Sequence, residues 1–385
     1  MKNGFAVIDG DGHMMEPHDI WRNYIDPECR ERIPNVIGDI GRQKHAYGPS
    51  EIHPEGFNQA SYAAERFATI GRQKYGDAFE SYWSIETRLR DMSSEGIDMM
   101  VCFPTSGTIA TFPGVAADLQ VALCRAYNNW ATDFCAASGG RVKFMAQVSL
   151  ERPEDAAREV RRLSGLREVA GVMLNDPTFE RFWAAEEYRT LWSALSDASL
   201  PAGFHGSVSQ QFLFRAWTRA GGYRAAVGHT LSFPMEAMAS LGGLILGGVL
   251  ERFPQLRVGF YEGNAGWVPW FLARLDMHDS GRQNHYSDGA LSMSPSEYFS
   301  RQCWVAGDSD EATLPTVVES LAGRNIIWNS DYPHVDAGFP GAVDEFLQQP
   351  IADRFKRMML GDNALELYGE RVANDLNRLV APSLG

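Results

Sequence analysis

The 385-residue chain has few cysteines and few lysines, and both scarcities exclude classes of site. Its five cysteines are odd in number and scattered, and no two are spaced as CxxC. Neither a disulfide framework nor a zinc knuckle is therefore indicated, and we expect free thiols. Only five of the 35 basic residues are lysine, so few positions could supply a lysine to a metal or a substrate.

Long apolar runs and clusters of positive charge are missing as well. No stretch approaches the ~18 consecutive apolar residues of a membrane span, and the longest candidate, residues 237–250, is broken by glycines. The N-terminus lacks the apolar segment and the cleavage site of a signal peptide. The net charge is −14 without a basic stripe, which argues against nucleic-acid binding. We expect a soluble, cytoplasmic protein whose partner is a small molecule.

The apolar content, by contrast, suffices for one large core. Hydrophobic residues make up 44% of the chain and aromatic residues 11%. Apolar runs alternate with helical patterns, and eight runs qualify as strands, starting at Phe5, Met99, Val142, Val169, Ala202, Leu256, Cys303 and Ile326. This alternation predicts a single α/β domain over residues 1–385, a (β/α)8 TIM barrel. A doubly wound sheet is the alternative, but its glycine-rich GxGxxG turn is absent.

A long irregular segment, residues 14–82, follows the first predicted strand. It is rich in glycine, proline, histidine and aromatic residues. Structureless loops of this length are uncommon inside compact domains, so we predict an insertion that covers the active-site end of the barrel. Together with some of the tryptophans, this insertion could line an apolar pocket.

Four of the predicted strands lead into polar residues. The apolar run at 7–8 leads into the sequence DGDGH at 9–13, and three later runs end at His205, Glu262 and Asp331. In a parallel barrel the carboxyl ends of all strands open on one face. Imidazole and carboxylate groups that are far apart in the sequence can therefore meet there and bind a metal ion.

The first of these clusters is the most informative. Asp9, Asp11 and His13 alternate just past a strand, so their side chains point the same way. Asp11 and His13 can reach one cation together, and Glu16 can join them if the chain turns. The competing interpretation is an ordinary aspartate turn before a loop. We favour the metal site because the chemistry of barrel enzymes lies at strand ends.

The later positions are more ambiguous. A lone histidine such as His205 is more often a satisfied core residue than a ligand, although the neighbouring glycines leave room for a cation. Asp331 ends a buried run and must be paired, hydrogen-bonded or ligated, because an isolated buried carboxylate is costly. His334 follows it within one turn.

These stretches resemble the amidohydrolase-2 family of metal-dependent TIM barrels, the group that contains aminocarboxymuconate-semialdehyde decarboxylase. The resemblance rests on IDGDGH at 8–13, FH at 204–205, GVLERFPQLR at 248–257, SDYPH at 330–334 and GDNALELYG at 361–369. It spans nearly the whole chain in the order of the family. It implies a metal-dependent barrel enzyme.

Carried over by position, the resemblance implies metal ligands at Asp11, His13, His205 and Asp331. Two departures stand out. Decarboxylases of the family have a catalytic histidine at the end of strand six, where this chain has Glu262. Binuclear hydrolases of the wider superfamily often use a carboxylated lysine on strand four, and residues 173–175 of this chain hold no lysine.

The remaining candidates are rich in carboxylates, and we predict metal ligands at Asp9, Asp11, His13, Glu16, His205, Glu262 and Asp331. This mixture suits iron or manganese, and carboxylates can bridge two ions. Two irons are therefore expected, with one zinc or manganese as the alternative. Glu262 is either the bridge or the partner of an arginine, with equal weight. Catalytic roles are predicted for Glu262, Asp331, His229 and His334, although His229 is at least as compatible with a surface loop.

Three functions follow from this set. The leading hypothesis is oxidative, because the start of the chain and the missing lysine resemble an amidohydrolase-fold monooxygenase whose nonheme diiron centre hydroxylates a diterpenoid intermediate. Such an enzyme would use O2 on a bulky apolar molecule. The alternative is a hydrolase of an ester, lactone or amide, in which the metal activates water. Nonoxidative decarboxylation ranks last, because Glu262 replaces the expected histidine. A homodimer is a further possibility.

Overall fold

The structure is a computed structural model that describes residues 1–17, 19–32, 36–37, 44–45, 69–105, 110–111, 115–176, 181–206, 223–279 and 291–380. For residues 36–37, 44–45 and 223–229 it describes the backbone alone. Within these residues, no helix is both long enough and apolar enough to cross a membrane.

Eight parallel strands form one sheet in the order β1-β4-β5-β6-β7-β8-β9-β10, which confirms the predicted TIM barrel. They are β1 (Ile8–His13), β4 (Met99–Phe103), β5 (Val142–Gln147), β6 (Val169–Leu174), β7 (Ala202–His205), β8 (Val258–Tyr261), β9 (Cys303–Gly307) and β10 (Ile326–Trp328). A separate antiparallel pair consists of β2 (Val36–Ile37) and β3 (Lys44–His45).

Backbone hydrogen bonds join the first strand to the chain that follows the last one. The amide of Asp331 donates to the Asp11 carbonyl at 3.0 Å, and the amide of His13 donates to the Tyr332 carbonyl at 2.6 Å. The barrel is thereby drawn together between β1 and β10. Asp331 is fixed beside β1 although 320 residues separate it from Asp11.

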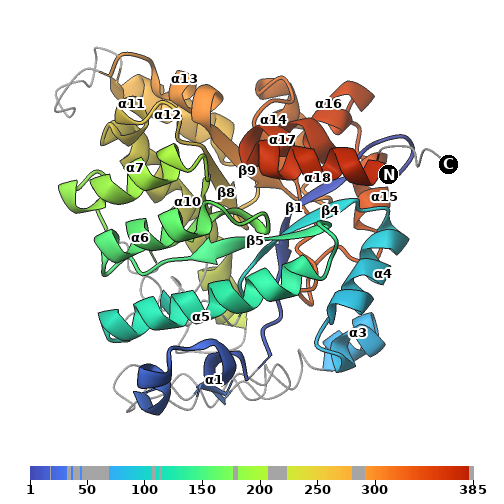
Figure 1. The fold of residues 1–385 in the computed structure, drawn as a ribbon. Helices are drawn as coiled ribbons and strands as arrows, with labels where there is room; N and C mark the ends of the chain where they lie inside the picture. Colours follow the sequence, from blue (N-terminus) through green and yellow to red (C-terminus); the bar gives the residue numbers. More distant parts are fainter. Residues whose placement is uncertain are drawn as a thin grey trace.

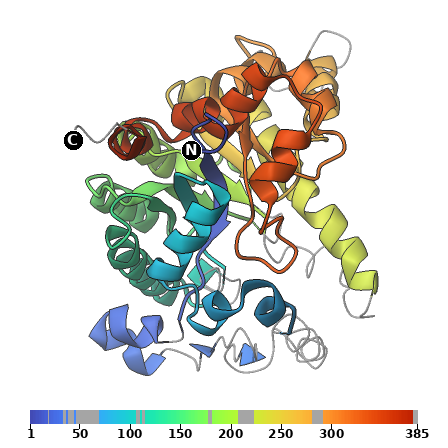
Figure 2. The same ribbon diagram turned by 90° about the vertical axis from the view of Figure 1, so that its right-hand side faces the viewer.

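The helices surround the barrel (Figures 1 and 2), and α5, α6 and α7 lie side by side on one face. Their bounds are α1 (Ile20–Tyr24), α3 (Asp77–Glu80), α4 (Ile85–Glu95), α5 (Ala117–Ala136), α6 (Pro153–Leu163), α7 (Arg189–Asp197), α10 (Tyr223–Leu246), α11 (Val249–Arg252), α12 (Val268–Asp279), α13 (Pro295–Gln302), α14 (Leu314–Ser320), α15 (Ala342–Gln348), α16 (Asp353–Arg357), α17 (Asn363–Tyr368) and α18 (Glu370–Val380). Short 3-10 turns occupy Pro27–Arg32 and Glu186–Tyr188, and Met358–Asp362 is a π-helical turn.

Local sequence signals account for several of these helix boundaries. The Ser84 side chain accepts a hydrogen bond from the Thr87 amide and caps the start of α4. Gly96 ends the same helix in a left-handed conformation with φ of 82°. Helix α6 begins with a proline and two acidic residues and ends with two arginines, as the helix dipole favours.

The first strand lies further along the chain than predicted. The apolar run suggested residues 5–8, whereas β1 contains the whole IDGDGH stretch. Its two glycines fit narrow spaces, because a Cβ on Gly10 would lie 2.7 Å from Ile327 Cδ1 and one on Gly12 would lie 2.8 Å from Met100 Sδ. The polar residues are therefore part of the strand itself, which an apolar pattern could not reveal.

Several helices also differ from expectation, since the pattern predicts one helix over residues 234–251 and leaves others out. Helix α10 begins at Tyr223 rather than Pro234, so the proline lies inside the helix and His229 is helical rather than in a loop. A proline is tolerated in a first turn, whereas in a helix interior it removes one backbone hydrogen bond and its ring clashes with the carbonyl four residues earlier, which costs about 3 kcal/mol. Helices α1, α3, α13 and α18 were not predicted, although the Ser294 and Glu297 capping box marks the start of α13.

The barrel interior is filled by apolar side chains below the polar end. Alternate residues of the strands, among them Met99, Val101 and Phe103, form a cluster with residues of α17 and α18. These two helices, red in Figure 1, therefore cover the end of the barrel at which the strands begin. The opposite end, where the strands finish, is left for the polar groups.

Only part of the segment 14–82 is described. Residues 18, 33–35, 38–43 and 46–68 lie outside the described residues, so the predicted cover over the barrel mouth stays a prediction. Helix α1 packs against α5. The Tyr75 hydroxyl donates to the His334 carbonyl at 2.7 Å, which anchors the loop after β10.

Candidate metal centre

Four side chains converge inside the carboxyl end of the barrel. Asp11 and His13 come from β1, His205 is the last residue of β7, and Asp331 follows β10. His13 Nε2 lies 3.7 Å from Asp11 Oδ1, 3.3 Å from Asp331 Oδ1 and 3.2 Å from His205 Nε2. His205 Nε2 lies 3.5 Å from Asp11 Oδ1.

These separations suit a common cation. Ligand atoms that each lie ~2.1 Å from one ion are roughly 3.0–3.4 Å apart at right-angled or tetrahedral positions. The observed values of 3.2–3.7 Å are slightly wider than this range. These values join the atoms of Asp11, His13 and His205, which form one group of candidate ligands, whereas Asp331 Oδ1 approaches the group through His13 Nε2 at 3.3 Å.

The electrostatics of the cluster also fit a cation. Asp11 Oδ1 is buried and has no hydrogen-bond partner among the described residues. Burial, reinforced by Asp331 and Asp9, raises the pKa of Asp11 well above its usual value. Burial, reinforced by His334 and His205, lowers the pKa of His13 well below its usual value. A metal ion would favour the ionised carboxylate and the neutral imidazole together.

Backbone and hydroxyl groups orient the two imidazoles. His205 Nδ1 lies 2.7 Å from the Gly206 carbonyl, which can only accept, so Nδ1 carries the proton and the Nε2 lone pair faces the cluster. His13 Nδ1 lies 3.2 Å from Thr105 Oγ1, which similarly leaves Nε2 toward the cluster. Thr105 follows β4, and its place just after an apolar strand was the signal that could have identified it.

Asp331 and His334 form a second, overlapping group with His13. Asp331 has φ of 55°, a conformation that is rare for residues other than glycine and that often marks functional sites. His334 Nδ1 lies 2.8 Å from Asp331 Oδ1. Burial acts to lower the pKa of His334, but contact with Asp331 and the nearby Glu262 outweigh it and raise that pKa to about 10.

The other predicted ligands occupy different positions. Asp9 Oδ1 accepts hydrogen bonds from the amides of Ser330 at 3.1 Å and Asp11 at 3.3 Å, and Oδ2 contacts the Ser330 hydroxyl. Glu16 Oε1 accepts from the Thr105 amide at 3.0 Å. Asp9 and Glu16 thus brace the strands beside the cluster in this structure, and their role as ligands remains a proposal.

Glu262 stands at the edge of the cluster. Its Oε2 lies 3.3 Å from His205 Nδ1, on the side of the ring away from the four converging atoms. Burial raises the pKa of Glu262 to about 8, against the opposing influence of His205. Its φ of 57° is again unusual.

The side chain of His229 lies outside the described residues, so its predicted role is untested.

A cavity of about 370 Å³ opens beside the cluster and is lined by Asp11, Glu262, Asp331 and several further carboxylates. Among them is Asp308, which directly follows β9 and accepts a hydrogen bond from Asn329 Nδ2 at 2.9 Å. Burial raises the pKa of Asp308 to about 7. Asp308 was not among the residues predicted from the sequence, although an apolar strand leads into it as into the other site residues.

The family model for amidohydrolases (Amidohydro_2) matches residues 8–369. The chain is 24% identical over 305 residues to 2-amino-3-carboxymuconate-6-semialdehyde decarboxylase of Dictyostelium discoideum, covering 74% of this chain and 77% of that protein. It is 20% identical over 293 residues to gamma-resorcylate decarboxylase of Rhizobium sp. (strain MTP-10005), covering 74% and 86%.

Solved structures share the fold. An amidohydrolase of Mycobacterium avium subsp. paratuberculosis K-10 has a TM-score of 0.72 at 20% identity, covering 95% of this chain and all (100%) of that one. The 5-carboxyvanillate decarboxylase of Novosphingobium aromaticivorans DSM 12444, complexed with manganese and a nitrobenzoic acid, has a TM-score of 0.68 at 19% identity, covering 95% and 97%. At these identities the likeness establishes the fold alone.

Proposed function

The chain belongs to the amidohydrolase family of metal-dependent enzymes, and from this premise we propose that it removes a carboxyl group from a small organic acid without oxidation. The observation that carries the proposal is the convergence of Asp11, His13 and His205, with Asp331 Oδ1 3.3 Å from His13 Nε2. The curated relatives with decarboxylase activity support this reaction more than the oxidative one expected from the sequence.

One divalent ion would be held on these four side chains. The two groups of candidate ligands, Asp11 with His13 and His205, and Asp331 with His13 and His334, have His13 in common. When bound, such an ion supplies Lewis acidity, holding an anionic oxygen of the substrate and offsetting its charge. Manganese fits the two carboxylates and two imidazoles, and a related decarboxylase has been solved with manganese.

Glu262 is the group placed to deliver a proton. It lines the cavity next to Asp11 and Asp331, at the strand end where the family resemblance had led us to expect histidine. In the proposed reaction the bond between carbon and the carboxyl group breaks and CO2 leaves. The electron pair that remains on carbon then takes the proton of the Glu262 carboxyl group.

The proposal is tested by measuring CO2 release. Protein loaded with Mn²⁺ is incubated with a panel of hydroxybenzoic and unsaturated dicarboxylic acids, and CO2 release is followed together with O2 consumption. We expect CO2 release without O2 uptake from at least one acid, and none from protein treated with a chelator. O2 uptake without CO2 release would overturn the decarboxylase assignment.

The oxidative reaction is the second candidate, because the cavity carries more carboxylates than one ion needs. Asp308, Asp310 and Asp336 line it in addition to Glu262. Two irons bound there and an apolar substrate hydroxylated with O2 remain the prediction from sequence, which no comparison supports. Elemental analysis separates the candidates, since the oxidative one requires close to two irons per chain.

A further inference from the structure

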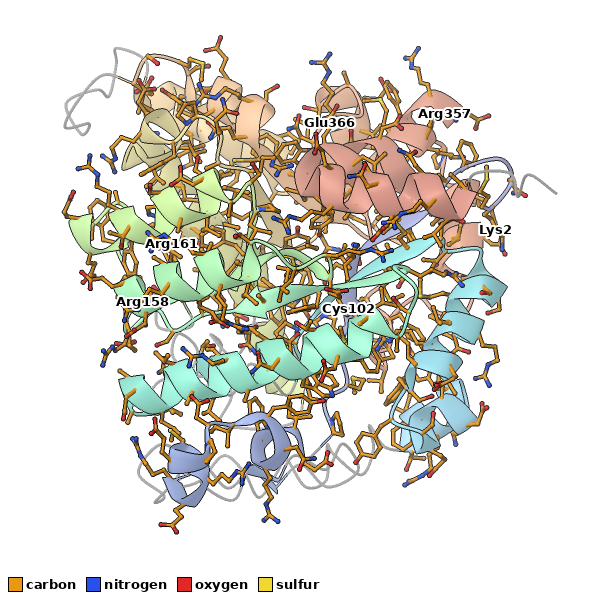
Figure 3. All side chains as sticks on the ribbon, viewed as in Figure 1. Lys2, Cys102, Arg158, Arg161, Arg357 and Glu366 are labelled. Carbon is orange, nitrogen blue, oxygen red and sulfur yellow. The ribbon has the colours of Figure 1, made fainter. Side chains whose placement is uncertain are left out.

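Helix α4 places a guanidinium group against the outer side of the metal centre. Arg88 is fully buried, and its Nη2 donates to the carbonyl of His13 at 2.7 Å. Its Nη1 lies 3.2 Å from Met100 Sδ and 3.5 Å from Cys102 Sγ. Its Cζ lies 5.1 Å from the centre of the Tyr332 ring. Figure 3 shows Cys102 deep in the interior, behind α5.

This buried charge lacks a counter-ion in the described part of the chain. No carboxylate there lies within 4.0 Å of the guanidinium, and Nε has no hydrogen-bond partner there. By contrast, Arg158 and Arg161 on α6 extend toward the surface (Figure 3). Burial of a charge without a counter-ion costs several kcal/mol, so stability of the fold alone does not account for an arginine at this position.

The contacts of Arg88 connect the segments that carry metal ligands. His13 is itself one of the four converging residues, and Tyr332 follows Asp331 directly. The His13 amide donates to the Tyr332 carbonyl, and the His13 carbonyl accepts from the guanidinium. Both backbone polar groups of His13 are therefore hydrogen-bonded. The guanidinium also packs on the Tyr332 ring. It thereby connects the end of β1, which carries His13, to the segment after β10, which carries Asp331.

We propose that Arg88 is a positioning residue for the metal centre, fixing the backbone of His13 and Tyr332 so that the His13 and Asp331 side chains keep their ligand geometry. This inference rests on the proposed metal site. Ligand atoms must be held within about 0.5 Å of productive positions to bind well. Without Arg88 the His13 carbonyl is left unpaired and buried, and the end of β1 can shift to satisfy it.

The test compares Arg88→Met with a matched control. Arg141 makes the same type of contact at the opposite end of β4, because its Nη2 donates to the Ile97 carbonyl at 2.6 Å. Chelator-treated wild type, Arg88→Met, Arg88→Lys and Arg141→Met are titrated with Mn²⁺ to obtain Kd, and circular dichroism and Tm are recorded for each.

We expect Arg88→Met to weaken Mn²⁺ binding by about 10- to 100-fold, as removal of groups that support metal ligands typically does. Arg88→Lys should recover part of the affinity, since an ammonium can donate to the His13 carbonyl but cannot stack on Tyr332 as a planar group. Arg141→Met should bind Mn²⁺ like the wild type. If Arg88 had a purely structural role, Arg88→Met and Arg141→Met would both lower Tm and would bind Mn²⁺ with the same Kd.

An unchanged Kd in a folded Arg88→Met variant would overturn the inference. Should Arg88→Met fail to fold, the lysine variant decides, because wild-type affinity in Arg88→Lys would also overturn it and weaker binding would support it. Wild-type protein that binds no Mn²⁺ would instead remove the proposed metal site, and with it the need for a positioning residue.

Discussion

Asp11→Asn should stabilise the metal-free protein while abolishing its metal binding. The carboxylate is buried against Asp331 and Asp9, and its Oδ1 lacks a hydrogen-bond partner among the described residues. An amide of the same shape carries no charge, and its N–H can donate to the Nε2 lone pairs of His13 and His205. The change therefore removes repulsion that only a cation would otherwise offset.

The magnitude follows from the unpaired group and the size of the protein. Leaving a buried polar group unsatisfied costs roughly 1–3 kcal/mol. An unfolding entropy of about 2.1 cal/mol/K per residue gives ~0.8 kcal/mol/K for 385 residues, so the metal-free variant should melt about 1–4 °C higher. Mn²⁺ at 100 times its Kd should add about 2.7 kcal/mol to the wild type, or ~3 °C, and nothing to the variant.

The gain should also depend on pH in a defined direction. The pKa of Asp11 is raised in the folded state, so the folded protein holds this proton to higher pH than the unfolded chain does. The loss of folding stability caused by ionising Asp11 is therefore absent below pH 3.8, the pKa of this group in the unfolded chain, and it grows as the pH rises above that value. Asp11→Asn should gain more stability at pH 8 than at pH 5.

The assay is thermal unfolding of chelator-treated wild type and Asp11→Asn at both pH values, with and without Mn²⁺. A lower Tm for the metal-free variant would refute the electrostatic reasoning. A metal-dependent rise in Tm that survives in the variant would show that Asp11 is not a ligand.

Three further substitutions test other parts of the site. His205→Ala should strip the metal while leaving the circular dichroism intact, and full occupancy by elemental analysis would contradict its assignment. Glu262→Gln should keep Mn²⁺ but lower kcat by about 10²–10⁴-fold, as loss of a general acid does; an unchanged kcat would exclude the proton role. Gly12→Ala should destabilise the protein by about 1–3 kcal/mol, because its Cβ would lie 2.8 Å from Met100 Sδ. Denaturant unfolding measures that loss, and a neutral result would mean that Met100 can move aside.

The strand order and several helices could be read from the sequence because they depend on local patterns. The proline and acidic residues at the start and the basic residues at the end predict a helix over residues 153–163, and α6 occupies these residues. Strands such as β6 are buried apolar runs bounded by polar residues. Helix α10 extends through Pro234 because a residue preference can be overridden by surrounding contacts.

The candidate site was partly accessible for the same reason. Polar residues after apolar runs identified His205, Glu262 and Asp331, and the alternation in β1 identified Asp11 and His13. The sequence could not tell which carboxylates face the common centre. Asp9 lies two residues before Asp11 on the same strand, yet its oxygens bond Ser330.

By itself, then, the sequence determined the eight-stranded barrel, the family and the set of polar residues from which a site could be built. Only the tertiary structure decided which of these residues face the common centre and which form hydrogen bonds beside it. Hydrogen bonds between β1 and the chain after β10 bring Asp331 beside Asp11, and α4 places Arg88 beneath His13. Such contacts join residues that are distant in the chain, and their distances and directions follow from the closure of the barrel rather than from any local pattern.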